Sequence, residues 1–575
     1  MDSRTAAHIL DQIGALLELG GAPRFNARAF QRAAQAVLAL GADDLGPLLE
    51  SGELKATPGV GPATISILQE LIETGESSYL SRLTESTPVG LLQMVRVPGL
   101  GAAKVQRIHR ELGVSTLDEL ASAAADGRLS KLPRFGAKTA ARVLQGIEFA
   151  RHATQQALYH RGLAQAVILR DSVDSHPDVI EAVIAGSVRR HVEIVGDVDV
   201  VAICSADPAA VAQSFANAPA VRKIDRDGAS ARICYVDDTR LDLYCASPET
   251  AAVTLWRATG SNAHVSALEE FAIQRGMMIN GDRLLDSTGK PVRLADESAF
   301  FEALGLQEIP PEMREGMGEI DAAADYALPV LLTSEDIRGA LHCHSTWSDG
   351  SATIADMANA ARQRGWSYIG ITDHSEAAFY AGGMKRDKVL RQHEEIDELN
   401  ARIKPFRILK GIEADILADG RVDFDSATLD LFDYVVGSVH SRFSMDGTAM
   451  TARVLKAMED PHLTILGHPT GRLLLSREAY PIDMAAVIEK ALDTGTVLEL
   501  NADPHRLDLD WRHCRMAKER GVMIEIGPDA HSENGLDAME IGVGMARKAW
   551  LTAGDILNAM PVEGVLAVAR AKRKR

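Results

Sequence analysis

The sequence contains few cysteines, no long apolar run and no excess of positive charge. Its five cysteines, an odd number among 575 residues, lie far apart in unmatched settings. This favours reduced thiols in a cytoplasmic protein over a disulfide framework. No apolar run approaches the length of a membrane span, and the N-terminal segment MDSRTAAHILDQIG has no apolar signal core. We expect a cytoplasmic, monomeric globular protein with no membrane partner.

The net charge of -19 argues against a protein coated in positive potential. The distribution of charge matters more than its sum, however, and it is uneven. Between residues 96 and 142 the chain carries nine Lys or Arg residues against four acids. This locally basic segment keeps nucleic acid open as a partner.

The chain changes character along its length. Residues 1 to about 150 show helical spacing with Gly and Pro punctuation, and β-branched runs such as VDVVAI and RLDLYC follow up to about 245. The segment MMINGDRLLD predicts a hairpin at Asn280-Gly281. After Gly339 strands and helices alternate to the end, which favours a βα barrel. The pattern predicts a multidomain protein of the α+β and α/β classes.

A glycine-turn unit recurs in the helical region, in TPGVGPATISILQELIETG, VPGLGAAKVQRIHRELG and LPRFGAKTAARVLQGIE. Such a turn exposes backbone amides at the start of a helix, where a DNA phosphate binds without regard to sequence. The third copy has Arg134 in place of the first glycine, so its hairpin is doubtful. The predicted DNA-binding residues are Gly59, Gly61, Gly99, Gly101 and Lys104.

Three aspartates form a second candidate site. Asp197 and Asp199 alternate on one strand, which places both on the same face, and Asp242 lies in another β-rich run. Three carboxylates on adjacent strands would hold two Mg²⁺ ions for phosphoryl or nucleotidyl transfer. Asp-Val-Asp alone is more often a solvated strand face. The nearby helix start at Gly186-Ser187, with Arg189 and Arg190, offers a triphosphate cradle and favours the functional interpretation.

The last forty per cent of the chain carries metal-ligand residues at the ends of short apolar runs. A βα barrel delivers such side chains from successive strand ends to one rim, as a polynuclear metal site requires. Scattered structural histidines would not recur at six strand ends. The candidate ligands are His342, His344, Asp349, Asp373, His374, Glu413, His440, His468, Asp529 and His531.

The motifs GSVRR, VGDVDV, RLDLY and TGSNAH resemble the polymerase core of the DNA polymerase beta family (family X). With the C-terminal metal-ligand string, which resembles a polymerase-and-histidinol-phosphatase (PHP) domain, nearly the whole chain is similar to bacterial family X DNA polymerases. The resemblance implies helix-hairpin-helix domains at 1–85 and 86–150, a palm at 151–248, a thumb at 249–315, a linker at 316–335 and a distorted (β/α)7 barrel at 336–575. It implies a DNA polymerase with 3′→5′ exonuclease activity that acts in repair, on gapped or nicked DNA with dNTPs.

The resemblance also assigns roles to the residues of the palm. Mg²⁺ would be held by the catalytic residues Asp197, Asp199 and Asp242. The implied nucleotide-binding residues are Gly186, Ser187, Arg190, Gly196, Arg240, Gly260 and Ser261.

In the barrel, the resemblance implies up to three Mn²⁺ or Zn²⁺ ions. His342, His344, Glu413 and Asp529 would hold one ion, and Glu413 would bridge to a second ion held by His440 and His468. Asp349, His374 and His531 would hold the third. Such a domain acts in relatives as a 3′→5′ exonuclease, an abasic-site endonuclease or a 3′-phosphatase. Arg442 and Arg472 follow two of the ligands, and contacts to a substrate phosphate or surface ion pairs are equally good interpretations.

Two departures from the family pattern bear on activity. An aromatic pair usually precedes Thr-Gly-Ser, and Arg257-Ala258 stands there instead, which puts sugar discrimination and polymerase efficiency in question. Ile67 stands where a lyase lysine would lie, and without an amine we predict no lyase activity. Two alternatives remain open: a metallophosphoesterase whose polymerase half only docks DNA, and a small-molecule phosphatase.

Overall fold

The computed structural model describes residues 1–575 except 2, 23, 39, 41, 43, 44, 75, 76, 96, 98, 99, 134, 137, 138, 145, 148–155, 219, 220, 237 and 238. Two residues of the glycine-turn predictions, Gly99 and Arg134, therefore lie outside the described residues. The chain divides into two compact units. The first comprises residues 1–154, 345–353 and 475–477, and the second comprises 155–344, 354–474 and 478–575.

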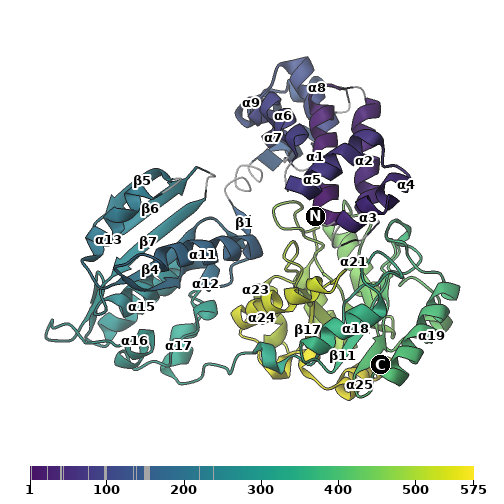
Figure 1. Cartoon of the computed structure of the whole chain (residues 1–575). Coiled ribbons are helices and arrows are strands. Elements are labelled where there is room, and N and C mark those ends of the chain that lie inside the picture. The colour runs from purple at the N-terminus through teal and green to yellow at the C-terminus, as the bar shows by residue number, and fades with distance from the viewer. Residues whose placement is uncertain are drawn as a thin grey trace. The chain divides into compact units, whose positions relative to one another are not determined.

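The first unit is helical, as predicted from its spacing (Figure 1). One core lies among α1, α2 and α5, and a second lies mainly among α7, α8 and α9. The elements are α1 (Ser3–Leu19), α2 (Arg24–Leu38), α3 (Gly46–Glu50), α4 (Glu53–Ala56), α5 (Pro62–Thr74), α6 (Ser78–Ser86), α7 (Val89–Val95), α8 (Ala102–Leu112), α9 (Leu117–Ala125) and the 3-10 helix η1 (Leu129–Lys131).

The second unit begins with a five-stranded sheet in the order β2-β4-β7-β6-β5, in which only the β4–β7 pair is parallel. Strand β1, which precedes the sheet in the chain, forms a small antiparallel pair with β3, which lies between β2 and β4 in the chain. Helices α11 and α13 pack on the sheet (Figure 1). The elements are β1 (Ala157–Leu158), α11 (Tyr159–Asp174), β2 (Val179–Ile184), α12 (Gly186–Arg189), β3 (Ile194–Val195), β4 (Val198–Cys204), α13 (Pro208–Ser214), η2 (Phe215–Asn217), β5 (Val221–Asp227), β6 (Ser230–Tyr235) and β7 (Arg240–Ala246).

A helical segment with one hairpin follows, and the turn predicted at Asn280-Gly281 joins its two strands. Part of the segment predicted as a linker folds here, because Ile320 and Ala323 belong to the same buried core as Trp256 and Phe300. The elements are α14 (Ala251–Thr259), α15 (Asn262–Gln274), β8 (Met278–Asn280), β9 (Arg283–Leu285), α16 (Glu297–Ala303), η3 (Pro311–Met313), α17 (Glu319–Ala324) and η4 (Ser334–Asp336).

Residues 339–575 alternate parallel strands with helices (Figure 1). The strands are β10 (Gly339–Ala340), β11 (Tyr368–Ile371), β12 (Arg407–Lys410), β13 (Glu413–Asp415), β14 (Val435–Ser438), β15 (Leu463–Leu466), β16 (Val497–Asn501) and β17 (Ile524–Gly527). The helices are α18 (Ile354–Gln363), α19 (Arg386–Arg402), α20 (Ser426–Leu429), α21 (Gly447–Ala457), α22 (Met484–Thr494), α23 (Trp511–Glu519), α24 (Ala538–Lys548) and α25 (Val562–Lys572), with the 3-10 helices η5 (Phe379–Ala381), η6 (Asn534–Asp537), η7 (Ala553–Asp555) and η8 (Leu557–Ala559).

The strands close into a ring at their carboxyl ends. Sheets β10-β11-β12 and β13-β14-β15-β16-β17 are joined by isolated bridges between His374 and Glu413 and between Cys343 and Ala530. Only two residues separate β12 from β13, so the two form one kinked strand. Within residues 339–575, all of which are described, this gives the distorted seven-stranded barrel that the family resemblance implies. Among the described helices of the chain, none is long and apolar enough to cross a membrane.

Candidate metal centres and nucleic-acid interface

The three palm aspartates converge on one face of the sheet. In the parallel β4–β7 ladder Asp199 lies opposite Asp242. Asp197 precedes β4 by one residue and is two residues before Asp199, so alternation directs both side chains to the same face. The sequence prediction that these carboxylates meet on adjacent strands therefore agrees with the register of the sheet.

The electrostatics of this cluster favour a cation. Burial and the carboxylates of Asp197 and Asp242 raise the pKa of Asp199 to about 7. Burial, and then Asp242, also raise the pKa of Asp197. Arg232, which sequence reasoning missed, donates from Nε to Oδ1 of Asp242 over 3.0 Å and from its NH2 nitrogen to Oδ2 over 3.1 Å. Crowded carboxylates, one of them paired with an exposed arginine, form a donor set suited to Mg²⁺.

The start of helix α12, at Gly186, lies very close to the aspartate triad. Gly186 has a φ of +58°, and a Cβ there would collide with the carboxylate of Asp199. The hydroxyl oxygen of Ser187 is buried and has no hydrogen-bond partner among the described residues. A buried polar atom without a partner is costly unless a ligand satisfies it. Gly186 and Ser187 thus fit a phosphate-binding turn beside the aspartates.

The other predicted nucleotide residues have mixed surroundings. Arg190 donates from Nε to Glu315 over 2.9 Å and from its NH1 nitrogen to the carbonyl oxygen of Thr259 over 2.6 Å. Ser261 caps α15, where its hydroxyl oxygen accepts from the backbone amide of His264 over 3.2 Å. Arg240 begins β7, and its charge only partly offsets the burial that raises the pKa of Asp197. Gly196 has open space where a Cβ would lie, whereas a Cβ on Gly260 would press on His264.

The first glycine turn, and Gly101 at the end of the second, lead into helices with open starts. Gly59 has a φ of +97°, and α5 begins directly after Gly61. Gly101 caps α8, in whose first turn Lys104 is exposed. Within the described part of the chain, and apart from the neighbours of each glycine in the sequence, no atom lies within 4 Å of the place of a Cβ at Gly61 or at Gly101. These helix starts leave room for a phosphate to approach the backbone amides.

In the barrel, nearly every predicted ligand follows the carboxyl end of a strand. His342 and His344 follow β10, and His374 follows β11. Glu413 begins β13, His440 follows β14 and His468 follows β15. Asp529 and His531 follow β17. Asp349 belongs to the other unit, so its role as a ligand stays a prediction. The carboxylate of Asp373 accepts from Gln392 over 2.6 Å, which places Asp373 in a supporting contact.

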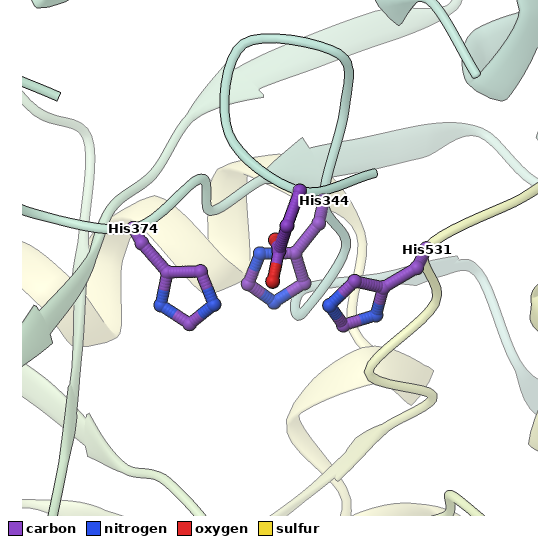
Figure 2. Close-up of side chains that lie close together, drawn as sticks. His344, His374 and His531 are labelled. Carbon is purple, nitrogen blue, oxygen red and sulfur yellow. The ribbon is translucent and has the colours of Figure 1, made fainter. Parts of the chain in front are cut away.

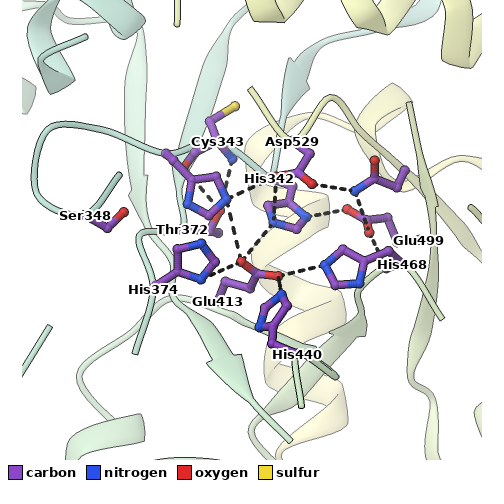
Figure 3. Close-up of polar contacts among 12 residues, drawn as sticks. His342, Cys343, Ser348, Thr372, His374, Glu413, His440, His468, Glu499 and Asp529 are labelled. Atoms are coloured by element: carbon purple, nitrogen blue, oxygen red, sulfur yellow. Dashed lines mark hydrogen bonds and ion pairs between the residues drawn. The ribbon is translucent and has the colours of Figure 1, made fainter. Parts of the chain in front are cut away.

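The carboxylate of Glu413 lies at the centre of these side chains (Figure 3). Its Oε1 is 3.0 Å from Nε2 of His468 and 3.2 Å from Nε2 of His440. Its Oε2 is 3.0 Å from Nδ1 of His374 and 3.5 Å from Nε2 of His342. Burial alone would raise the pKa of Glu413, but the surrounding histidines hold it well below its usual range.

A second group comprises His342, His344 and Asp529, whose ligand atoms all lie within 4.8 Å of one another. His342 Nε2 is buried and finds no hydrogen-bond partner in the part of the chain that the structure describes, while carboxylate oxygens of Glu413 and Asp529 lie 3.5 and 3.6 Å away. These distances are long for hydrogen bonds and match the separation of two ligands on one ion at about 2.1 Å each. The donor set therefore fits a divalent cation.

His344 also approaches His374 and His531 (Figure 2). The rings of His344 and His531 stack with centroids 4.2 Å apart, and those of His344 and His374 are 4.6 Å apart. Ligand atoms of the three rings lie within 4.8 Å of one another. Three imidazoles gathered in this way suit Mn²⁺ or Zn²⁺, and the donor set does not choose between them.

Sequence reasoning missed the residues that support these ligands. Glu499 hydrogen-bonds Nδ1 of His342 and accepts from the backbone amide of His468 over 2.5 Å (Figure 3). Arg506 places Nε 3.3 Å from Oδ2 of Asp529. Burial lowers the pKa of His468 to about 3, and the Arg506 charge adds to that effect. In the sequence, each of these supporting residues is an isolated polar residue outside any motif, so no local pattern indicates its role.

The two arginines that follow candidate ligands in the sequence have different surroundings. Arg442 is exposed, with a φ of +60°. Arg472 is held by the carbonyl oxygens of Arg506 and Leu507, by Asp510 over 3.1 Å and by Glu193 over 3.5 Å. The structure therefore favours an ion-pair role for Arg472 over a phosphate contact.

Comparison with known proteins extends the resemblance. Three family models match: a SAM-like helix-hairpin-helix tandem at residues 91–148, a DNA polymerase beta thumb at 254–315 and a PHP domain at 340–502. The DNA polymerase/3′-5′ exonuclease PolX of Bacillus subtilis is 35% identical over 572 residues, which cover 99% of each chain. A probable phosphatase of Caldanaerobacter subterraneus is 30% identical over 207 residues, 33% of this chain and 74% of its own.

Proposed function

The chain belongs to the family X DNA polymerases that carry a PHP domain, and from this premise we propose that its palm fills gaps in DNA during repair while its barrel trims 3′ ends. The enzyme is a DNA polymerase with a 3′→5′ exonuclease domain. Its substrates are gapped or nicked DNA and dNTPs. The single observation that carries the polymerase half is the register that sets Asp199 opposite Asp242.

In the palm, Asp197, Asp199 and Asp242 would hold Mg²⁺. When bound, the ions activate the primer 3′-hydroxyl and stabilise charge on the triphosphate. The buried hydroxyl of Ser187, which no described residue hydrogen-bonds, would donate to a phosphate oxygen, and Arg190 would contribute positive charge. The open helix starts at Gly61 and Gly101, with Lys104, would hold the DNA backbone independently of sequence.

In the barrel, Glu413 and the surrounding histidines and aspartates would hold Mn²⁺ or Zn²⁺. Bound ions lower the pKa of water and clamp the oxygens of a phosphodiester. The position of Arg506 is evidence that the substrate is a phosphoester, because its guanidinium lies at the edge of this cluster, 3.3 Å from Asp529. Arginine suits the recognition of phosphate oxygens. Trimming of 3′ ends follows from hydrolysis at this site.

One double substitution tests the division of labour. Asp197→Ala with Asp199→Ala should abolish primer extension on a gapped duplex and leave Mn²⁺-dependent 3′ digestion within twofold of wild type. His342→Ala with His344→Ala is the matched variant in the barrel and should give the opposite pattern. Equal loss of both activities in either variant contradicts two independent sites.

A second candidate is a metallophosphoesterase whose polymerase half only docks DNA. It is favoured by Arg257, which replaces one of the family's aromatic residues and pairs with Glu269 over 2.7 Å. It is also favoured by the similarity to a probable phosphatase. Near-zero nucleotide incorporation by the wild-type chain on a gapped duplex, with active 3′ digestion, would establish this alternative. Rapid phosphate release from histidinol phosphate would instead revive a small-molecule phosphatase.

A further inference from the structure

Helix α24 of the barrel makes close contact with residues of the palm and thumb in the same unit. A Cβ at Gly544 would collide with the ring of His191. Near the end of the same helix, Arg547 donates from Nε to Oε1 of Glu312 over 2.7 Å. The next residue is Lys548, one turn beyond Gly544. Only a glycine allows so close an approach of α24 at this point, so the contact is specified by the sequence.

Lys548 is the buried cation of this interface, with 1% of its surface exposed. Its Nζ donates to the carbonyl oxygen of Arg190 over 3.1 Å and to the carboxylate of Glu315. The same ammonium lies 4.9 Å from the ring centroid of Trp511. An ammonium buried this far requires paired charge and hydrogen-bond acceptors. Lys548 finds both on palm and thumb residues.

Glu315 is shared between the barrel and the palm. The oxygen that accepts from Lys548 also accepts from Nε of Arg190 over 2.9 Å. Another nitrogen of the Arg190 guanidinium holds the carbonyl oxygen of Thr259. Thr259 directly precedes the predicted nucleotide residues Gly260 and Ser261. A chain of contacts therefore runs from α24 through Glu315 to the arginine assigned to the triphosphate.

We infer that Lys548 is a positioning residue for nucleotide incorporation, acting from the barrel through Glu315 on Arg190. This inference rests on the proposed polymerase function. By binding the same carboxylate, Lys548 partly neutralises Glu315 and leaves more of the Arg190 charge for a triphosphate. Without Lys548, the negative charge of Glu315 falls on Arg190 alone, and the attraction for the nucleotide weakens.

Lys548→Met tests the inference in the full chain, because methionine keeps the packing against Trp511 and removes the charge. With a one-nucleotide gapped duplex, Mg²⁺ and the matching dNTP, we expect the KM for the dNTP to rise threefold to tenfold and kcat to stay within twofold. Adding Glu315→Gln removes the uncompensated carboxylate and should return KM to within twofold of wild type. Mn²⁺-dependent 3′ digestion at the wild-type rate reports that Lys548→Met folds.

Arg547→Met is the matched control, since it breaks a neighbouring contact of the same interface without touching Glu315. An equal rise of KM in Arg547→Met and Lys548→Met would show general loosening and overturn the inference. If wild type is active and the KM of Lys548→Met is unchanged, the inference about Lys548 is wrong while the polymerase proposal stands. If wild type itself incorporates no nucleotide, the polymerase proposal is wrong. Glu315→Gln alone, which leaves Lys548 in place, should lower KM, and a rise of KM in that variant contradicts the inference even if Lys548→Met does not fold.

Discussion

Asp415 places Oδ1 2.8 Å from Nδ1 of His440, on the side of the imidazole ring opposite to the nitrogen that faces Glu413. A carboxylate at Nδ1 accepts the proton of that nitrogen and leaves Nε2 with its lone pair for a metal ion. Asp415 itself is 5% exposed. The pair therefore fixes both the orientation and the tautomer of a predicted ligand.

Asp415→Ala should lower the affinity of the barrel for Mn²⁺ or Zn²⁺ by about 10-fold to 100-fold, as is usual when such a supporting carboxylate is removed. Metal retained after dialysis, measured by plasma mass spectrometry, checks this. Asp430→Ala is the control, because Asp430 pairs with His462 over 3.0 Å outside the predicted ligand set. Equal metal retention by the two variants would contradict a supporting role for Asp415.

The Mg²⁺ requirement of primer extension should depend on pH through Asp199. Burial, Asp197 and Asp242 raise its pKa to about 7, so that below this pH a proton occupies the carboxylate. Since the carboxylate must be ionised to bind Mg²⁺, the apparent dissociation constant for Mg²⁺ should increase about tenfold when the pH falls from 8 to 6. Titration of extension rate with Mg²⁺ at each pH measures it. Activity lost at pH 6 that saturating Mg²⁺ fails to restore would rule out this competition.

The sequence carried enough to predict the barrel, the strand-end positions of the candidate ligands and the adjacency of the palm aspartates, because these follow from local periodicity. Alternation aligns Asp197 with Asp199, and the parallel strands of a barrel bring their carboxyl ends to one rim, where His440 and His468 follow β14 and β15. Residues that act through distant partners gave no such signal. Glu499 lies 157 positions from His342 along the chain. Lys548, likewise, is one basic residue on an amphipathic helix until the fold places it against Glu315.

Sugar selection should be weak in this chain. Ala258 stands where the family carries an aromatic residue beside the nucleotide sugar, and Arg257 is drawn into an ion pair with Glu269. Ala258→Phe should therefore raise the preference for dNTP over rNTP, measured as the ratio of kcat/KM values, by at least fivefold. The reason is steric, since a phenyl ring fills space that a 2′-hydroxyl would otherwise enter. An unchanged ratio would show that selection lies elsewhere.

Lyase chemistry should be absent from the first glycine hairpin. Ile67, which stands at the position of the family's lysine, is buried in the helical core with 7% of its surface exposed. Helix α5 contains no lysine, and a Schiff base requires an amine. Borohydride reduction of the chain mixed with 5′-deoxyribose-phosphate DNA should trap no covalent adduct. An adduct that survives Lys55→Ala, the nearest lysine in the sequence, would require an amine from another part of the chain.

The core of residues 251–324 should depend strongly on one buried carboxylate. Glu297 Oε1 accepts from the fully buried Arg314 over 2.5 Å, and its Oε2 accepts from Arg189 over 2.6 Å. Glu297→Ala leaves the Arg314 charge uncompensated, and the expected loss of stability is about 3–5 kcal/mol. Glu269→Ala breaks the exposed pair with Arg257 and should cost at most about 1 kcal/mol. Hydrogen exchange of residues 251–324 in both variants measures the difference, and comparable protection in the two would disprove the role of Glu297.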